Sequence, residues 1–101
     1  MTFRTLWHER EYDEAVDDLV SQNPRYADAV AGVEWNIARE ASKFPLIRES
    51  DTGIADMRIG PSEPIGGLSP LAIYFTIDTR DTGTLWAVVR LSLGDLYLSL
   101  N

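Results

Sequence analysis

Hydrophobic and polar positions alternate most regularly between residues 71 and 91. Residues 71–78 alternate with period two, which is the pattern of a strand with one buried face. Residues 84–91 are rich in β-branched and aromatic side chains and predict the returning strand. Between them, Asp81 and Gly83 are typical of a turn. The pattern therefore predicts a β-hairpin long enough to form the centre of a sheet.

A period of 3.6 residues replaces this alternation in the first half of the chain. Apolar residues recur at i, i+3, i+4, i+7 and i+8 within residues 9–21 and predict a helix there. Asn23 and Pro24 are typical of an N-cap and a first helical residue, so a second helix is predicted over residues 24–43. Because the connection is short, the two helices are expected to form an antiparallel hairpin.

Shorter patterns complete the prediction. A first strand is expected over residues 2–7, another over residues 54–59, and a last strand or apolar tail within residues 96–100. Three prolines and three glycines within residues 60–70 predict a long loop. The chain is therefore expected to be a single α+β domain, residues 1–101. It would have an N-terminal strand, a helix hairpin and a three- to four-stranded antiparallel meander.

The composition excludes several kinds of site. The chain of 101 residues has no cysteine, which excludes disulfides, thiolate metal sites and a cysteine nucleophile. No metal-ligand spacing and no phosphate-binding glycine loop are present, so we expect no metal and no cofactor. We interpret the single histidine, His8, as a surface or capping residue. No segment approaches ~18 apolar residues and no apolar signal region follows the N-terminus, which predicts a cytoplasmic protein without a membrane span.

The net charge of −7 disfavours direct binding of nucleic acid, because an acidic surface repels phosphates. Six of the ten residues from 9 to 18 are acidic. The simplest interpretation is a solvated face at a helix N-terminus, where the helix dipole stabilises carboxylates. Alternatively, Asp13, Asp17 and Asp18 bind a basic protein partner.

Four other side chains are candidate site residues. Arg58, Arg80 and Arg90 lie on predicted strands or their turn, where guanidinium groups can clamp phosphate. The alternative, which we favour, is that they pair with neighbouring aspartates. Trp35 lies opposite the apolar stripe of its helix, and we expect it to be buried on a second side of that helix. Exposure in a partner-binding site is the alternative for Trp35.

The element order and several segments together resemble a known superfamily. The segments are FRTLWH (residues 3–8), the helix pair, Arg58-Ile59, PLAIYFTID (residues 70–78) and residues 84–91. Residues 70–78 are similar to a P-L-x-V-x-Y/F-x-(I/V)-D strand. The chain resembles the RelE/ParE toxins of bacterial toxin–antitoxin modules. The resemblance implies a small sheet with two helices packed on one face, and a partner antitoxin that lies along this surface.

The resemblance also implies two kinds of target. RelE-like members cleave mRNA on the ribosome, and ParE-like members poison DNA gyrase. The RelE-like nuclease uses arginines on the sheet and a C-terminal tyrosine, for which Arg58, Arg90 and Tyr97 are the candidates. The central strand nevertheless begins with Pro70 and Leu71 in place of arginine, and residues 93–96 contain no basic residue. The phosphate would therefore lack charge stabilisation, and the sequence leans against an enzyme.

Three hypotheses follow. The first is a toxin-like component that acts through protein–protein contact and is neutralised by a cognate antitoxin. The second is a non-catalytic acidic interaction or inhibitor protein on the same fold. The third and weakest is a ribosome-dependent mRNA endonuclease. The sequence predicts no particular oligomeric state.

Overall fold

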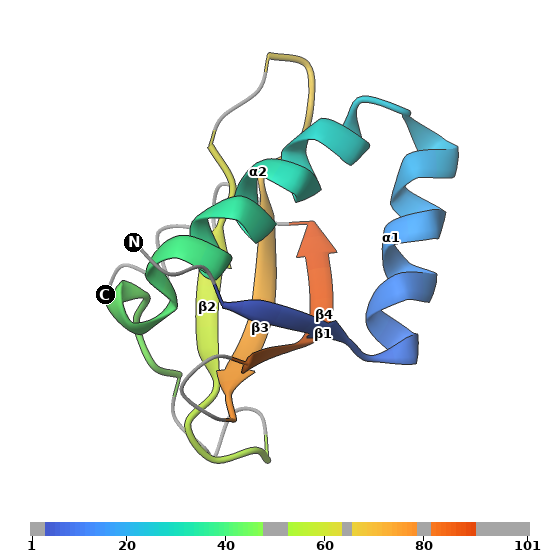
Figure 1. Ribbon diagram of the computed structural model, residues 1–101. Coiled ribbons are helices and arrows are strands. Elements are labelled where there is room, and N and C mark those ends of the chain that lie inside the picture. Colours follow the sequence, from blue (N-terminus) through green and yellow to red (C-terminus); the bar gives the residue numbers. More distant parts are fainter. Residues whose placement is uncertain (1–3, 48–52, 64–65, 79–81, 91–101) are drawn as a thin grey trace.

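The computed structural model describes residues 4–47, 53–63, 66–78 and 82–90 (Figure 1). These residues form four strands, two α-helices and one short 3-10 helix, which confirms the α+β class. Along the chain the elements are β1 (Thr5–His8), α1 (Arg10–Gln22), α2 (Tyr26–Glu40), the 3-10 helix η1 (Ala41–Lys43), β2 (Arg58–Pro61), β3 (Leu71–Ile77) and β4 (Thr82–Arg90).

The sheet is mixed, with the strand order β1-β4-β3-β2. Strands β2, β3 and β4 form the predicted antiparallel meander. Strand β1, however, pairs with β4 in parallel, with Thr5 opposite Thr82. The expectation of a purely antiparallel sheet is wrong at this edge. Parallel neighbours need a long crossover connection, and the whole chain between β1 and β4 supplies it.

Several predicted boundaries move. The predicted strand over residues 54–59 begins only at Arg58, because Asp56 has φ 57° and turns the chain just before it. The predicted second helix begins at Tyr26, after a turn in which Asn23 Oδ1 accepts a hydrogen bond from the Arg25 amide at 3.0 Å. The turn predicted from Asp81 and Gly83, over residues 79–83, is shorter than expected, because Thr82 and Gly83 already belong to β4. Residues 79–81 and the predicted last strand within 96–100 lie outside the described residues.

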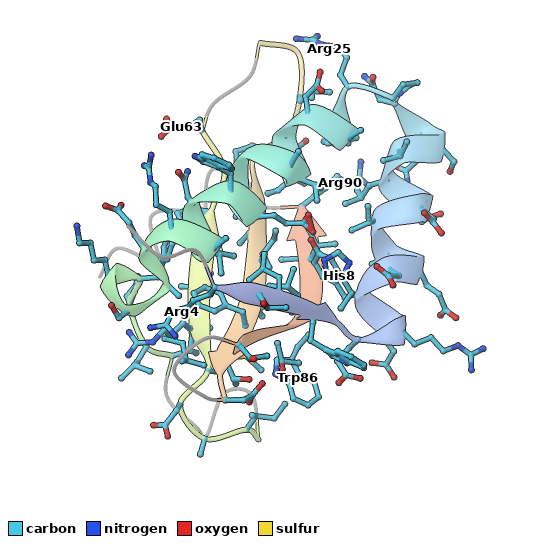
Figure 2. All side chains as sticks on the ribbon, viewed as in Figure 1. Arg4, His8, Arg25, Glu63, Trp86 and Arg90 are labelled. Atoms are coloured by element: carbon cyan, nitrogen blue, oxygen red, sulfur yellow. The ribbon has the colours of Figure 1, made fainter. Side chains whose placement is uncertain are left out.

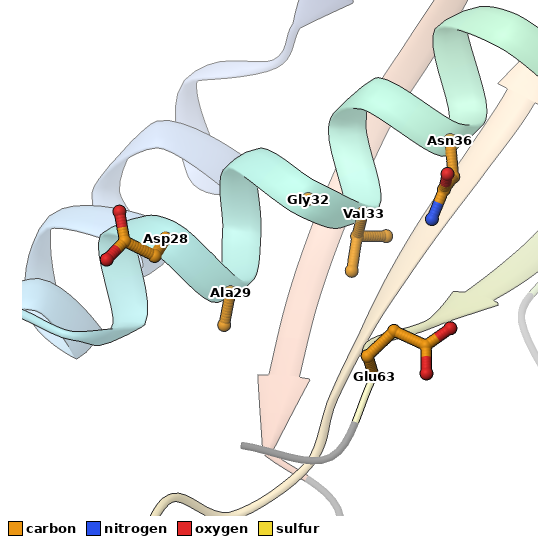
Figure 3. A pocket seen from close by; sticks show the side chains of 6 residues that line it. All are labelled: Asp28, Ala29, Gly32, Val33, Asn36 and Glu63. Carbon is orange, nitrogen blue, oxygen red and sulfur yellow. The ribbon is translucent and has the colours of Figure 1, made fainter.

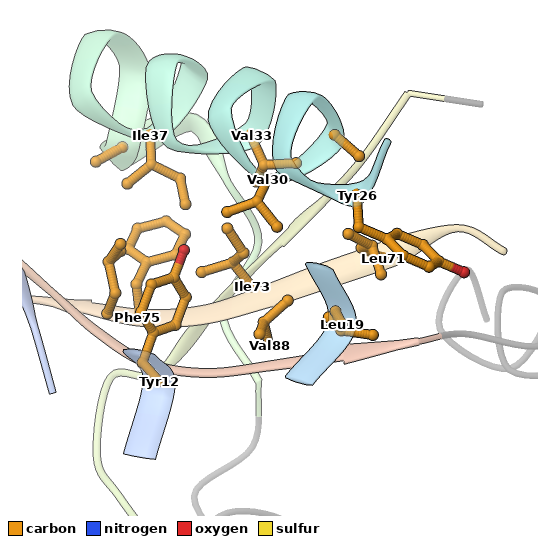
Figure 4. Close-up of a cluster of buried hydrophobic side chains, with 13 residues drawn as sticks. Tyr12, Leu19, Tyr26, Val30, Val33, Ile37, Leu71, Ile73, Phe75 and Val88 are labelled. Carbon is orange, nitrogen blue, oxygen red and sulfur yellow. The ribbon is translucent and has the colours of Figure 1, made fainter. Parts of the chain in front are cut away.

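Both helices cover the same face of the sheet and close the core between them (Figure 4). Helix α1 packs along β4, and α2 crosses β3 toward β2. The alternating residues Leu71, Ile73 and Phe75 of β3 are fully buried beneath the helices. The other buried members of this core are Tyr12, Leu19, Tyr26, Ala29, Val30, Val33, Ile37, Ala41, Leu85 and Val88.

The opposite face of the sheet carries a polar network at a β-bulge. The register of β3 and β4 shifts between Tyr74 and Phe75, and this leaves Trp86 as the extra residue of β4. Trp86 Nε1 donates to Thr76 Oγ1 at 2.8 Å, and Thr76 Oγ1 donates to Asp78 Oδ1 at 3.1 Å. The Thr84 hydroxyl donates to the second carboxylate oxygen of Asp78. The two buried threonines are thereby hydrogen-bonded, as buried polar groups must be.

The outer edge of β2 is covered by the segment after η1. The Ile47 amide donates to the Met57 carbonyl at 2.7 Å, and the Ile59 amide donates to the Pro45 carbonyl at 3.1 Å. An edge strand with open backbone groups invites pairing with other chains, so this segment protects β2. Among the helices that the structure describes, none is long and apolar enough to cross a membrane.

Candidate functional site

Arg58, the first candidate catalytic residue, has a structural role. It is half-buried at the start of β2, and its Nη1 donates to the carbonyls of Phe44 at 2.5 Å and Ser42 at 3.3 Å. A guanidinium bound to backbone carbonyls joins β2 to the end of the helical region. Arg58 is therefore placed as a structural clamp and does not present its charge to a phosphate.

Arg90 lies at the far end of β4, on the helix-covered side (Figure 2). Arg58 is opposite Phe75 and Arg90 is opposite Leu71, four residues apart along β3 and on its two sides. From strand geometry, their Cα atoms are roughly 16 Å apart. The structure does not bring the two arginines into one site.

Tyr26, at the start of α2, lies close enough to Arg90 to feel its charge. Figure 4 shows its hydroxyl pointing out of the core. Burial alone would raise the pKa of Tyr26, but hydrogen bonds with Ser69 and Arg90 and the Arg90 charge lower it below its usual value. The remaining candidates Tyr97 and Arg80 lie outside the described residues.

We expect Arg58→Ala to lower the free energy of unfolding by about 1.5–3 kcal/mol, because it removes two hydrogen bonds from a charged donor. Arg58→Lys should retain part of this stability, since an ammonium group can reach one carbonyl. Urea denaturation measures the free energy of unfolding of both variants. Arg10→Ala is the matched control, because Arg10 only pairs with Glu14 on the exposed side of α1 and should cost less than about 0.5 kcal/mol. Equal losses for Arg58→Ala and Arg10→Ala would contradict the clamp.

His8 lies where β1, α1 and α2 meet (Figure 2). Its Nδ1 is 2.9 Å from Asp13 Oδ1 and its Nε2 is 3.1 Å from Glu34 Oε1. Its ring packs edge-on against Tyr12 with centroids 5.1 Å apart. Both ring nitrogens face carboxylates, so neither is open to take a proton from a substrate. The arrangement joins one strand to two helices.

Glu34 is the member of this group that sequence reasoning missed. Tyr12 is buried and its hydroxyl donates to Glu34 Oε1 at 3.0 Å. Burial, and next the charge of Glu34, raise the pKa of Tyr12, so the phenol remains a donor. The sequence feature that could have identified Glu34 is its position on α2. It lies four residues after Val30 and thus beside the apolar stripe of the helix. Within the part of the chain that the structure describes, no three His, Cys, Asp or Glu residues are placed to hold a metal ion.

The acidic candidates on α1 have two different roles. The Asp13 carboxylate is hydrogen-bonded to the His8 ring. Asp17 and Asp18 are exposed, and Asp18 Oδ2 accepts a hydrogen bond from Gln22 Nε2 at 3.1 Å on the same helix. The outer face of α1 is therefore acidic and solvated beyond Asp13.

Trp35 is 54% exposed, so the expectation of burial is wrong. The sheet covers only the side of α2 that carries Val30, Val33 and Ile37, and at 100° per residue Trp35 lies on the opposite side. On another flank of α2, the helix and Glu63 enclose a shallow hollow of about 110 Å³ (Figure 3). The residues that line it are Asp28, Ala29, Gly32, Val33, Asn36 and Glu63.

Among the described residues the geometry supplies a histidine that joins three elements, an acidic face on α1, and an exposed tryptophan and a shallow hollow on different sides of α2. Comparisons with protein-family models, with curated proteins and with solved structures gave no match to this chain.

Proposed function

We propose that this chain is a toxin-like component of a bacterial toxin–antitoxin module, related to the RelE/ParE toxins. It acts through protein–protein contact in the cytoplasm and is neutralised by a cognate antitoxin. The observation that carries the proposal is the order β1-α1-α2-β2-β3-β4 with both helices on one sheet face. This is the arrangement that the resemblance implies.

Contact is favoured over RNA cleavage by the placement of the arginines. Cleavage needs preorganised positive charge where the phosphate becomes more negative. The Arg58 guanidinium is bound to backbone carbonyls, and Arg90 is remote from it, near Tyr26. The overall charge of −7 also opposes the approach of RNA. A ribosome-dependent nuclease is therefore the weakest candidate.

Tightly controlled induction of this chain alone in bacteria tests the proposal. We expect growth arrest, while translation and DNA supercoiling are followed in parallel. Early loss of translation would indicate the ribosome as target, and early loss of supercoiling would indicate gyrase. Phe75→Ala combined with Ile37→Ala, two core truncations that together should leave little folded protein, controls for the burden of expression. Unimpaired growth with folded wild-type protein would contradict a toxin.

The second candidate is a non-catalytic acidic interaction or inhibitor protein, and the exposed acidic face of α1 favours it. Asp17→Lys with Asp18→Lys tests this face without touching the Asp13 pair with His8. We expect the double variant to bind a lysine-rich helical peptide at least about tenfold more weakly than wild type at low salt. Equal binding by both proteins would exclude this face as a partner site.

A further inference from the structure

Two arginines lie at the end of the molecule where α2 begins. Arg25 immediately precedes α2, and Arg90 is the last residue of β4. Figure 1 shows that β4 ends on the side of the sheet where α2 begins, and Figure 2 labels both arginines there. Both are exposed. On a chain with a net charge of −7, this end of the molecule is a local concentration of positive charge.

No acidic side chain neutralises these two arginines within the part of the chain that the structure describes. The ion pairs there use His8, Arg10 and Lys43 as the cations, and none of the pairs includes Arg25 or Arg90. A guanidinium group has five N–H donors in a fixed fork. Both arginines therefore keep donors that an acceptor from outside the chain can use.

The loop before β3 links the two arginines. A Cβ at Gly67 would lie 3.5 Å from Arg25 Nη1, so the Arg25 guanidinium lies against the backbone of this loop. Two residues later, the exposed Ser69 lies close enough to the Tyr26 hydroxyl to lower its pKa by hydrogen bonding. The Arg90 charge acts on the same hydroxyl. The chain from Gly67 to Ser69 thus connects the Arg25 guanidinium to Tyr26 and Arg90.

Tyr26 shows that this end of the molecule stabilises negative charge on oxygen. Its ring is buried, and its hydroxyl points out of the core (Figure 4). Burial would raise the pKa of Tyr26, but the hydrogen bonding of Ser69 and the nearby Arg90 lower it below its usual value. Groups that stabilise a phenolate oxygen in this way also stabilise an oxygen of a bound anion.

The side chains, and not the backbone of α2, would hold such an anion. The Tyr26 amide donates to the Asn23 carbonyl at 3.0 Å, and the Ala27 amide donates to the Pro24 carbonyl at 3.1 Å. Two guanidinium groups and two hydroxyls suit a phosphate group, which offers several strong acceptor oxygens and up to two negative charges. A small phosphate compound also avoids the repulsion that the acidic surface exerts on a polyanion, because charges more than about 10 Å away are screened at 0.1 M salt.

We propose that Arg25, Tyr26, Ser69 and Arg90 form a binding site for a phosphate group, either as free phosphate or as the terminal phosphate of a small monoester. The two arginines supply the positive charge, and the two hydroxyls donate hydrogen bonds to the remaining oxygens. The proposal does not depend on the toxin-like function, and it involves no cleavage.

A titration of the full chain with phenyl phosphate, followed by NMR of its backbone amides, tests the site. At pH 7.5 and a constant ionic strength of about 50 mM, we expect a dissociation constant of about 0.1–5 mM, with shifts at Gly67 and Ser69. Inorganic phosphate that binds within about threefold of phenyl phosphate would support a site for free phosphate, and weaker binding would support a site for a monoester. Absence of saturable binding of both compounds up to about 20 mM, or acetate that binds as tightly as they do, would overturn the proposal.

Substitutions of single arginines show whether these residues hold the phosphate. Arg25→Gln and Arg90→Gln should each weaken the binding of phenyl phosphate by at least about fivefold, and Arg25→Lys should fall between Arg25→Gln and the wild type. Arg39→Gln is the matched control, because it removes the same charge from an exposed position roughly 21 Å further along α2. It should bind within about twofold of wild type.

Substitutions of the hydroxyl groups complete the test. Tyr26→Phe keeps the ring in the core, and Ser69→Ala changes an exposed position, so both variants should unfold thermally close to wild type. Each should weaken binding by about two- to fivefold. Unchanged affinity in both arginine-to-glutamine variants at Arg25 and Arg90, or an equal loss in Arg39→Gln, would assign the binding to the general charge of the surface and overturn the site.

Discussion

Replacing Phe75 by alanine is expected to lower the free energy of unfolding by about 3–5 kcal/mol. Phe75 is 0% exposed at the middle of β3, and its ring meets Phe44 edge-on with centroids 5.6 Å apart. The truncation loses the transfer free energy of the ring and leaves a cavity that the neighbouring strands cannot collapse into. Because small domains are stable by only about 5–15 kcal/mol, this loss removes much of the margin.

Urea denaturation followed by far-UV circular dichroism measures the effect. Val89→Ala on β4 is the control, because Val89 is partly exposed and its truncation should cost less than about 1 kcal/mol. Phe75→Leu keeps part of the volume and should fall between the two. A loss below about 1 kcal/mol for Phe75→Ala would show that the centre of β3 is not the core of the fold.

Ile37→Ala should cost about 2–5 kcal/mol for the same physical reason. Ile37 is 0% exposed on α2 and packs against the backbone of β2 at Gly60. A Cβ at Gly60 would lie 3.4 Å from Ile37 Cδ1 and 3.5 Å from Val33 Cγ1. A Cβ at Gly60 would therefore just touch α2, and only a larger side chain would press against Ile37 and Val33.

This close approach predicts that the effect of one substitution changes sign with its background. Gly60→Val in the wild type should cost about 1–3 kcal/mol, because its methyl groups overpack Ile37 and Val33. In the Ile37→Ala background the same change fills part of the cavity and adds a good strand former, so it should be neutral or stabilising. Chemical denaturation of the four proteins gives the coupling energy. Additive losses would mean that the two residues do not share this space.

The acidic candidate residues of α1 do not all lie in one site. The sequence presents Asp13, Asp17 and Asp18 as one run, and a helix distributes them over its surface. Asp13 faces His8 at the end of β1, whereas the other two face water. A partner-binding experiment on the whole run would therefore disturb the fold and the surface together, and the substitutions proposed above leave Asp13 unchanged.

The candidate catalytic arginines are also separated in the structure. Arg58 and Arg90 both lie on strands, as their surroundings in the sequence predict. Their separation follows from the strand order, which puts β3 between them, and from the register along β3. No local pattern carries that information, because pairing joins residues that are distant in the chain.

The sequence by itself determined the local elements. Period-two alternation identified β3 and β4, the 3.6-residue period identified α1 and α2, and Asn23 identified their connection, because each signal comes from residues that are neighbours in the chain. It also determined which side chains of β3 share one face, since side chains alternate across a strand, but Ala72 and Thr76 on the other face are buried as well.

Only the tertiary structure decided how these elements meet. It placed β1 parallel to β4, bound the Arg58 guanidinium to the carbonyls after α2 and joined His8 to Glu34. It also left Trp35 exposed, because the sheet reaches only one side of α2. Each of these outcomes depends on contacts between distant parts of the chain. No single segment of the sequence determines the free energy of those contacts.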